Sequence, residues 1–310
     1  MLKKIKTNQN KSNVKRKKFD FKKFLSPLII TLLVVLLIYS ISLLVPFVWG
    51  FFTSLKGKYE IRNNPFGLPE EWLFVNYLQA FDNFKVRVEW GDGFRWVYFE
   101  EMFLNSVLYS LGCALIQSFT TCIVAYVIAR FSHFKFSKIV YTVVIIVMIL
   151  PIVGSQPSEL ALARQLGLYD EMWGIWIMRL NFLGIYFLVF HAMFKGIPKD
   201  YADAAYIDGA SEWQVMTKIM LPMSRNTLLT VILLNFIGYW NDYQTPLLYI
   251  PSHPTLAYGL YLFSNSPDNE LATIPMKITG CMLMMVPILI IFLIFRKRLI
   301  GNISIGGLKE

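Results

Sequence analysis

Long apolar runs with few or no charged residues constrain the fold of this chain more than any other feature. Each run approaches or exceeds the length of about 20 apolar residues that a helix needs to cross a bilayer. Hydrophobic residues make up 55% of the 310 positions and charged residues only 16%, which is typical of membrane proteins. Because lipid offers no hydrogen-bond partners to the backbone, each run should be an α-helix. The sequence therefore predicts an all-α integral membrane protein.

Six runs are predicted to be transmembrane helices. They are Phe24–Leu55, Met102–Ala129, Ile139–Ser158, Met172–Phe194, Ser224–Pro246 and Ile278–Phe295. The fourth run contains Arg179 and His191, so a buried re-entrant helix is the alternative there. The fifth carries Asn235, Asn241 and Asp242 toward its end, and polar groups within a span tend to face a cavity because exposing them to lipid is costly.

Basic residues predict the orientation. Under the six-span model, 21 of the 30 Lys and Arg residues lie on one face, ten of them in residues 1–23. An excess of basic residues marks the cytoplasmic face, so both termini should be cytoplasmic. The basic N-terminal segment is interpreted as an anchor beside anionic lipid, and nucleic-acid binding is the less favoured alternative.

This topology divides the chain into five parts. They are a basic cytoplasmic segment at 1–23, a first transmembrane helix at 24–55, an extracellular loop at 56–101, a five-helix core at 102–300 with a cytoplasmic segment at 198–222, and a cytoplasmic tail at 301–310. In the extracellular loop, the pattern EEWLFVNYLQAF predicts one short amphipathic helix at the outer interface.

The polar segment DAAYIDGASEWQVMTKIMLP has strong local structural signals. Asp200, just before it, is predicted to cap a short helix, which Gly209 ends by permitting a left-handed backbone. Ser211 and Gln214 have the spacing of a capping box that begins a second helix. Pro222 marks where that helix must stop or bend. A helix, a glycine corner and a second helix make a compact element suited to docking.

The sequence lacks the motifs of enzymes and metal sites. Cys113, Cys122 and Cys281 have no metal-ligand spacing and are expected to pack in the core. There is no Ser/His/Asp set and no glycine-rich phosphate loop. If the protein moves a solute uphill, either an ion gradient or a partner must supply the energy.

The same polar segment resembles the cytoplasmic signature of bacterial ABC importer permeases, E-A-A-x-x-x-D-G-A followed by an apolar residue and L-P. The matching residues are Asp203, Ala204, Ala205, Asp208, Gly209, Ala210, Ile219, Leu221 and Pro222. Asp203 stands where Glu is usual, which keeps the charge but shortens its reach. Two residues separate Ala205 from Asp208, as is common in the carbohydrate-uptake branch. Arg225 and Asn226 occupy a place where the carbohydrate-uptake branch often has proline.

The resemblance extends across nearly the whole chain. The strings SLKGKYEI, FVNYLQAF, FLNSVLYS, AYVIARFSHF, GYWNDYQTPLL and GNISIGGLKE occur in the order typical of that branch. The pattern is similar to the second permease subunits of oligosaccharide importers, such as the maltose transporter's smaller permease.

This resemblance implies a type I ABC importer permease fold in the bacterial plasma (inner) membrane, and a transporter subunit rather than an enzyme. It implies a second homologous permease, two cytoplasmic ATPase subunits that bind ATP and Mg, and an extracellular solute-binding protein. The chain itself is expected to bind no cofactor, no metal and no nucleic acid. The implied solute is a carbohydrate, most simply an oligosaccharide. The alternatives are glycerol phosphate, a polyanionic saccharide, or a secondary transporter that needs no ATPase.

The fifth span also carries a candidate substrate path. Its members are Asn235, Tyr239, Trp240, Asn241 and Asp242, which offer amides, rings and a carboxylate. Sugars are held by such mixtures of polar groups and ring faces. The competing interpretation is packing of this helix against the partner permease.

Overall fold

A computed structural model describes residues 27–150, 154–265 and 272–303, and in the last stretch it describes the side chains only up to residue 295. The chain forms two compact units, residues 1–49 and residues 50–310. The first unit contributes most of helix α2 (Pro27–Ser54), which corresponds to the first predicted span. The basic segment 1–23 and the tail beyond residue 303 lie outside the described residues.

Within the described residues, four helices are long and apolar enough to cross a membrane. They are α2, α5 (Phe99–Arg130), the continuous helical run Glu212–Trp240, and Ile274–Phe295 of α15 (Ile274–Ile303). These four correspond to the first, second, fifth and sixth predicted spans. A helical, multi-span membrane protein is thereby confirmed, whereas the count of six spans is not.

The fourth predicted span, Met172–Phe194, is not one helix. It is divided into α8 (Met172–Met178) and α9 (Ile185–Gly196). Between them the Asn181 Oδ1 accepts a hydrogen bond from the Leu183 backbone N–H at 2.7 Å, and Gly184 has a φ of 136°. These two residues keep the chain non-helical between α8 and α9, because the amide forms a local turn and the glycine takes a backbone conformation that other residues avoid.

The third predicted span, Ile139–Ser158, is interrupted as well. Helix α6 (Lys135–Ile149) ends before Gly154, which has a φ of 86°, and α7 (Gln156–Gln165) begins after it. Residues 151–153 lie outside the described residues. A left-handed glycine cannot continue a right-handed helix, so the prediction of one helix through Ser158 was wrong.

The loop 56–101 contains a small β-hairpin besides its helices, an addition that leaves the predicted all-α class unchanged. It contains α3 (Glu60–Asn63), α4 (Val75–Asn83) and an antiparallel hairpin of β1 (Val86–Trp90) and β2 (Gly93–Val97). The short helix predicted from EEWLFVNYLQAF begins only at Val75. The hairpin had a sequence signal in the alternation of VRVEWGDGFRWV around a two-residue turn that starts with Gly91, whose φ is 56°.

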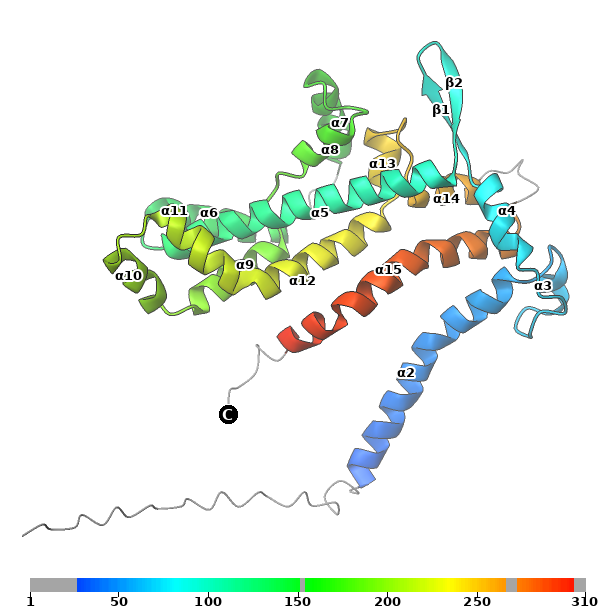
Figure 1. The fold of residues 1–310 in the computed structure, drawn as a ribbon, viewed down its shortest axis with the longest axis horizontal. Coiled ribbons are helices and arrows are strands. Elements are labelled where there is room, and N and C mark those ends of the chain that lie inside the picture. The colour runs from blue at the N-terminus through cyan, green and yellow to red at the C-terminus, as the bar shows by residue number, and fades with distance from the viewer. Residues whose placement is uncertain (1–26, 151–153, 266–271, 304–310) are drawn as a thin grey trace, which may run out of the picture. The chain divides into compact units, whose positions relative to one another are not determined.

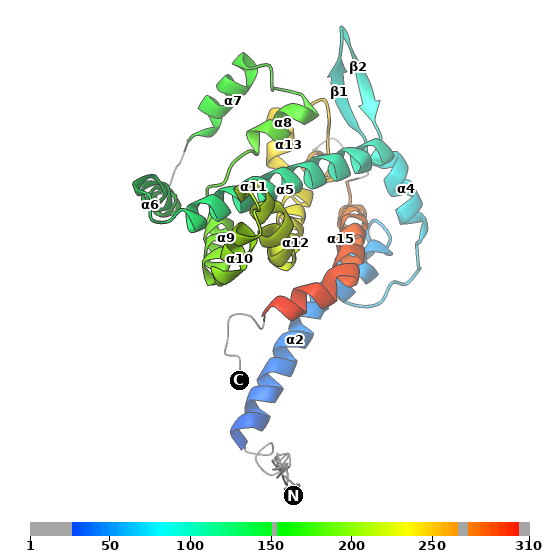
Figure 2. The same ribbon diagram turned by 60° about the vertical axis from the view of Figure 1, so that its left-hand side comes forward.

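Helix α5 is the centre of the second unit. It packs along α9 and along α12 (Leu221–Trp240), as Figure 1 and Figure 2 show. At its N-terminal end it contacts α4, the hairpin and α14 (Leu256–Asn265), which with α15 enclose one apolar cluster. Toward the same end, α7, α8 and α13 (Gln244–Tyr249) enclose a smaller cluster around the buried Tyr109 and Cys113. A third cluster fills the space between its C-terminal half, α9 and α12.

The two ends of α5 carry different elements. The β-hairpin leads directly into its N-terminus, and α10 (Asp200–Ile207) lies beside its C-terminal residue Arg130. In Figure 1 the hairpin and α10 are accordingly at opposite ends of the helix. At about 1.5 Å per residue, the 32 residues of α5 exceed the hydrocarbon thickness of roughly 30 Å. A membrane crossed by α5 therefore has these two elements on opposite sides.

Candidate functional site

The segment 198–222 forms two short helices joined at a glycine corner. Helix α10 ends at Ile207, and Gly209 follows with a φ of 81°. The Gly209 N–H donates to the Tyr206 carbonyl at 3.0 Å, and the Ala210 N–H donates to the Ala205 carbonyl at 2.9 Å. These two bonds form a Schellman motif, which satisfies carbonyls at the helix end and requires a left-handed residue. The predicted role of Gly209 in ending the helix is confirmed.

The second helix of the segment begins with the predicted capping box. The Ser211 Oγ accepts from the Gln214 backbone N–H at 3.3 Å, and the Gln214 Oε1 accepts from the Ser211 N–H at 2.8 Å. The prediction for the first helix was wrong, because the N-cap of α10 is Lys199 and makes no side-chain hydrogen bond. Asp200 is instead the first helical residue, where its charge still complements the positive end of the helix dipole.

Pro222 does not end the second helix. After α11 (Glu212–Val215), a π-helical turn covers Met216–Met220 and continues into α12. In this turn the Leu221 N–H donates to the Met216 carbonyl, five residues back. The extra residue widens the turn, and such a turn relieves the clash that proline makes with the carbonyl four residues before it. The segment 198–222 is thus joined without a break to a helix long enough to cross a membrane.

Contacts with α5 hold the segment in place. Arg130, the last residue of α5, pairs with Asp203 at 3.7 Å, and its guanidinium lies 5.3 Å from the centre of the Tyr206 ring. The Tyr206 hydroxyl donates to Glu212 Oε2 at 2.5 Å and so joins α10 to α11. Partial burial, together with this hydrogen bond to the Glu212 carboxylate, raises the pKa of Tyr206. The phenol therefore stays a neutral donor at physiological pH.

The nine residues of the signature are not all placed alike. Ala205 is buried, and Ala210, Ile219 and Leu221 are partly buried. Those exposed to solvent are Asp203, Ala204, Asp208, Gly209 and Pro222. The buried alanine faces the protein, so the signature combines a packing face with an exposed face.

Two exposed apolar side chains on this segment were missed by the sequence analysis. Ile207 is 87% exposed and Trp213 is 68% exposed. The helical period gives the signal, because Ala202 and Ala205 share the packing face of α10 and Ile207 does not. Large apolar groups held in water on a rigid element are typical of a protein-binding surface.

In the candidate substrate path, the structure brings Asn235 and Tyr239 to the face of α12 that packs on α5. The Asn235 amide donates to Ser118 Oγ at 2.9 Å, and the Tyr239 hydroxyl contacts Gln117 Oε1. Trp240 is different, since it is 2% exposed and its Nε1 donates to the Met284 carbonyl at 3.1 Å. Its ring is covered by packing within this chain and has no face open to a solute.

Asp242 belongs to a polar cluster where α5 and α12 meet the outer elements. The Tyr109 hydroxyl donates to its Oδ2 at 2.9 Å, and the Thr245 N–H donates to its Oδ1 at 3.0 Å. Arg179 donates to the Thr245 Oγ1 at 3.2 Å, and its guanidinium lies 5.3 Å from the Tyr239 ring centre. Tyr109 was missed by the sequence analysis, because its position within an apolar run gave no signal.

The fifth residue of the predicted path, Asn241, is exposed and turned back on its own helix. Its amide donates to the Ile237 carbonyl at 2.8 Å.

The three cysteines were all expected to pack in the core. Cys113 and Cys122 are buried as expected, whereas Cys281 is exposed.

A family model matches the chain over residues 121–304, which is more than half of its length. The family is described as the binding-protein-dependent transport system inner membrane component. The matched region includes the segment 198–222, α12 and α15.

Curated relatives match over most of their length. The diacetylchitobiose uptake system permease protein NgcG of Streptomyces coelicolor is 27% identical over 277 residues, which cover 88% of this chain and 87% of the relative. The arabinooligosaccharides transport system permease protein AraQ of Bacillus subtilis is 27% identical, over 75% of this chain and 80% of the relative.

A solved structure has the same fold. It is a chain of a bacterial ABC transporter involved in the import of the acidic polysaccharide alginate, and it matches with a TM-score of 0.68 at 22% identity. The match covers 86% of this chain and 95% of that chain.

Proposed function

This chain belongs to the family of binding-protein-dependent transport system inner membrane components, and from that premise we propose that it is a permease subunit of an ATP-driven carbohydrate importer. Members of this family are multi-pass membrane subunits of transporters and not enzymes. Their systems depend on a solute-binding protein.

The proposal that the solute is a carbohydrate is supported by the relatives. Those described above are named for transport of diacetylchitobiose and of arabinooligosaccharides, and each matches over most of both chains. We propose an oligosaccharide as the solute of this chain. Asn235, Tyr239 and Asp242 then contribute to its path, because they combine an amide, a ring and a carboxylate where α12 faces α5.

The observation that carries the proposed ATP coupling is the geometry of the segment 198–222. It is capped, joined continuously to a spanning helix, tied to the end of α5 by Arg130, and exposes Ile207 and Trp213. A rigid element of this kind can transmit the closure of an ATPase to the membrane helices as a rigid-body movement. The ATPases, two in the proposed complex, hold ATP and Mg; this chain holds neither.

The proposed orientation places both termini and the segment 198–222 in the cytoplasm, since most basic residues lie on that face. The β-hairpin side then meets the solute-binding protein, and a second, homologous permease completes the membrane part. The bacterial plasma membrane is the proposed location.

Reconstitution of the complete importer in liposomes tests this function. We expect uptake of a labelled oligosaccharide that requires the binding protein and ATP hydrolysis, with no uptake when a non-hydrolysable ATP analogue is supplied. Uptake by this chain alone, driven by an ion gradient, would instead identify a secondary transporter. Uptake of glycerol phosphate or of an acidic saccharide, with neutral oligosaccharides rejected, would correct the solute.

A further inference from the structure

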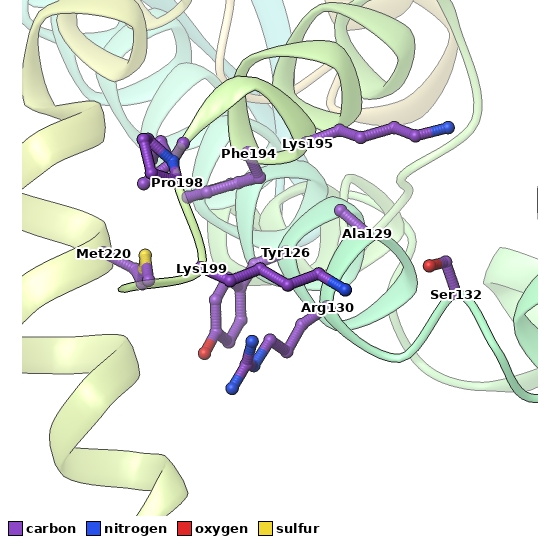
Figure 3. Close-up of a pocket in the computed structure, with 10 residues that line it drawn as sticks. Tyr126, Ala129, Arg130, Ser132, Phe194, Lys195, Pro198, Lys199 and Met220 are labelled. Atoms are coloured by element: carbon purple, nitrogen blue, oxygen red, sulfur yellow. The ribbon is translucent and has the colours of Figure 1, made fainter. Parts of the chain in front are cut away.

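A cationic pocket lies between the C-terminal ends of α5 and α9 and the start of α10 (Figure 3). Its volume is about 280 Å³, several times the roughly 30 Å³ that one water occupies. Its polar lining includes Arg130, Lys195, Lys199, Ser132 and Tyr126. Figure 3 shows the side chains of Lys195 and Lys199 extended on either side of the same space, with the Ser132 hydroxyl facing it.

The described residues offset the positive charge of this pocket only in part. Among the described residues, Lys195 and Lys199 have no acidic partner within ion-pair distance. Arg130 has one, Asp203, at 3.7 Å, but that carboxylate is 60% exposed and only partly offsets the guanidinium. Three cations around one cavity repel one another unless an anion occupies it.

A buried hydroxyl gives an independent sign of a ligand. Tyr126 is 4% exposed, and its hydroxyl has no hydrogen-bond partner within the described residues. Figure 3 shows this hydroxyl on the same side as the Arg130 guanidinium. A buried hydroxyl without a partner is costly, and an anion with several acceptor oxygens removes that cost.

A second pocket of about 460 Å³ adjoins the first and shares Ser132 and Lys195 with it. Its lining includes Lys138, Tyr141 and Thr142 of α6, which again are polar groups at a helix end. The same helix exposes apolar side chains one and two turns further along, at Ile146 and Ile149. Polar groups at one level and exposed apolar groups just beyond it match the headgroup and the acyl chain of a lipid.

We propose that this cationic pocket binds the phosphate group of an anionic phospholipid headgroup, held by Lys195, Lys199 and Arg130. Basic pockets between membrane helices are suited to such headgroups, and each Lys near the surface adds to their attraction. Because Arg130 also pairs with Asp203, an occupied site stabilises the position of the segment 198–222 against α5. The lipid thereby supports the element that we propose to dock on the ATPase.

The test uses the complete importer in nanodiscs of equal parts phosphatidylcholine and phosphatidylglycerol. The variant is Lys195→Gln with Lys199→Gln, and the control is Arg225→Gln, an exposed cation that lines neither pocket. Native mass spectrometry counts the phosphatidylglycerol that stays bound after the bulk lipid is removed. We expect the double variant to retain about one fifth or less of the phosphatidylglycerol that the wild type retains. The control should retain the wild-type amount.

The other outcomes overturn the proposal. Equal retention of phosphatidylglycerol by the double variant and the control would show that the pocket does not hold this lipid. Retention of labelled inorganic phosphate in pure phosphatidylcholine, with no enrichment of phosphatidylglycerol in the mixture, would identify a soluble anion instead. Loss of the ATPase subunits from the double variant with lipid retention unchanged would identify an acidic side chain of the ATPase as the occupant.

Discussion

Gly209 adopts a backbone conformation that residues with a side chain avoid. Its φ of 81° lies in the left-handed region, and nothing in the described part of the protein lies within 4 Å of the position of an added Cβ. The cost of a substitution there is therefore backbone strain alone, without a steric clash. A substitution at Gly209 therefore tests the glycine corner of the segment 198–222 without disturbing side-chain packing.

We expect Gly209→Ala to weaken ATPase binding, because strain of about 1–2 kcal/mol opposes the corner. Co-purification of the ATPase subunits and ATP-driven uptake measure this effect. Gly196→Ala is the matched control, since Gly196 also has open space around it but no left-handed φ. Normal uptake and normal assembly in Gly209→Ala would show that the corner has no part in coupling.

Asn235 is the residue at which the proposed substrate path is most directly tested. We expect Asn235→Ala to raise the apparent KM for the sugar by about two- to tenfold, which corresponds to one lost hydrogen bond. Asn226→Ala, an exposed asparagine near the other end of α12, should leave KM unchanged. An unaltered KM in Asn235→Ala would argue that the amide only packs against Ser118.

Individual residues were predictable where the signal is local. The predictions for Gly209 and for the Ser211–Gln214 pair were correct, because a left-handed glycine and a capping box depend on a few neighbouring positions. Trp240 and Tyr109 were not predictable, because whether a ring is buried depends on elements far away in sequence, such as α15 for Trp240.

At the scale of elements, α8 packs closely on α5 at Gly112. A Cβ on Gly112 would lie 2.2 Å from the Trp176 Nε1, well inside contact distance. We expect Gly112→Ala to lower the free energy of unfolding by about 1–3 kcal/mol, the usual cost of overpacking.

Thermal unfolding of the purified complex measures this cost. The control is Gly238→Ala, a helical glycine on α12 with open space around it. A transition temperature that stays at the wild-type value in Gly112→Ala would show that the Trp176 ring moves aside without cost.

The exposed apolar side chains of the segment 198–222 lead to a prediction about ATPase binding. We expect Ile207→Ser with Trp213→Ser to reduce ATPase co-purification strongly while leaving folding intact, because both side chains are already in water in this chain. Phe66→Ser is the control, since Phe66 is 85% exposed but lies in the loop that leads toward the β-hairpin. Retention of the ATPases by the double variant would rule out this surface as the docking site.

At the scale of the whole molecule, α5 separates the β-hairpin from the segment 198–222. The proposed orientation makes a definite prediction for cysteine labelling in intact cells, in a background where Cys281 is replaced by Ser. Asp92→Cys, at the exposed hairpin turn, should react with a membrane-impermeant maleimide, whereas Lys218→Cys should react only after the cells are opened. The reverse pattern would invert the topology.

The sequence by itself determined the class of this protein. Apolar runs long enough to span a bilayer predict a helical membrane protein because lipid leaves the backbone no alternative partners. Local spacing determined the glycine corner and the capping box, since both involve bonds within a few residues. The order of short motifs along the chain was sufficient to indicate the transporter family.

Only the tertiary structure decided how these helices are interrupted and what they face. Runs of apolar residues look alike whether they are one helix or two, so the breaks at Gly154 and Gly184 were not visible as breaks in hydropathy. The same holds for the polar cluster around Asp242 and the cationic pocket around Lys195, whose members come from separate helices. Local signals act between neighbours in sequence, whereas a site is made by neighbours in space, and these are brought together only by packing around α5.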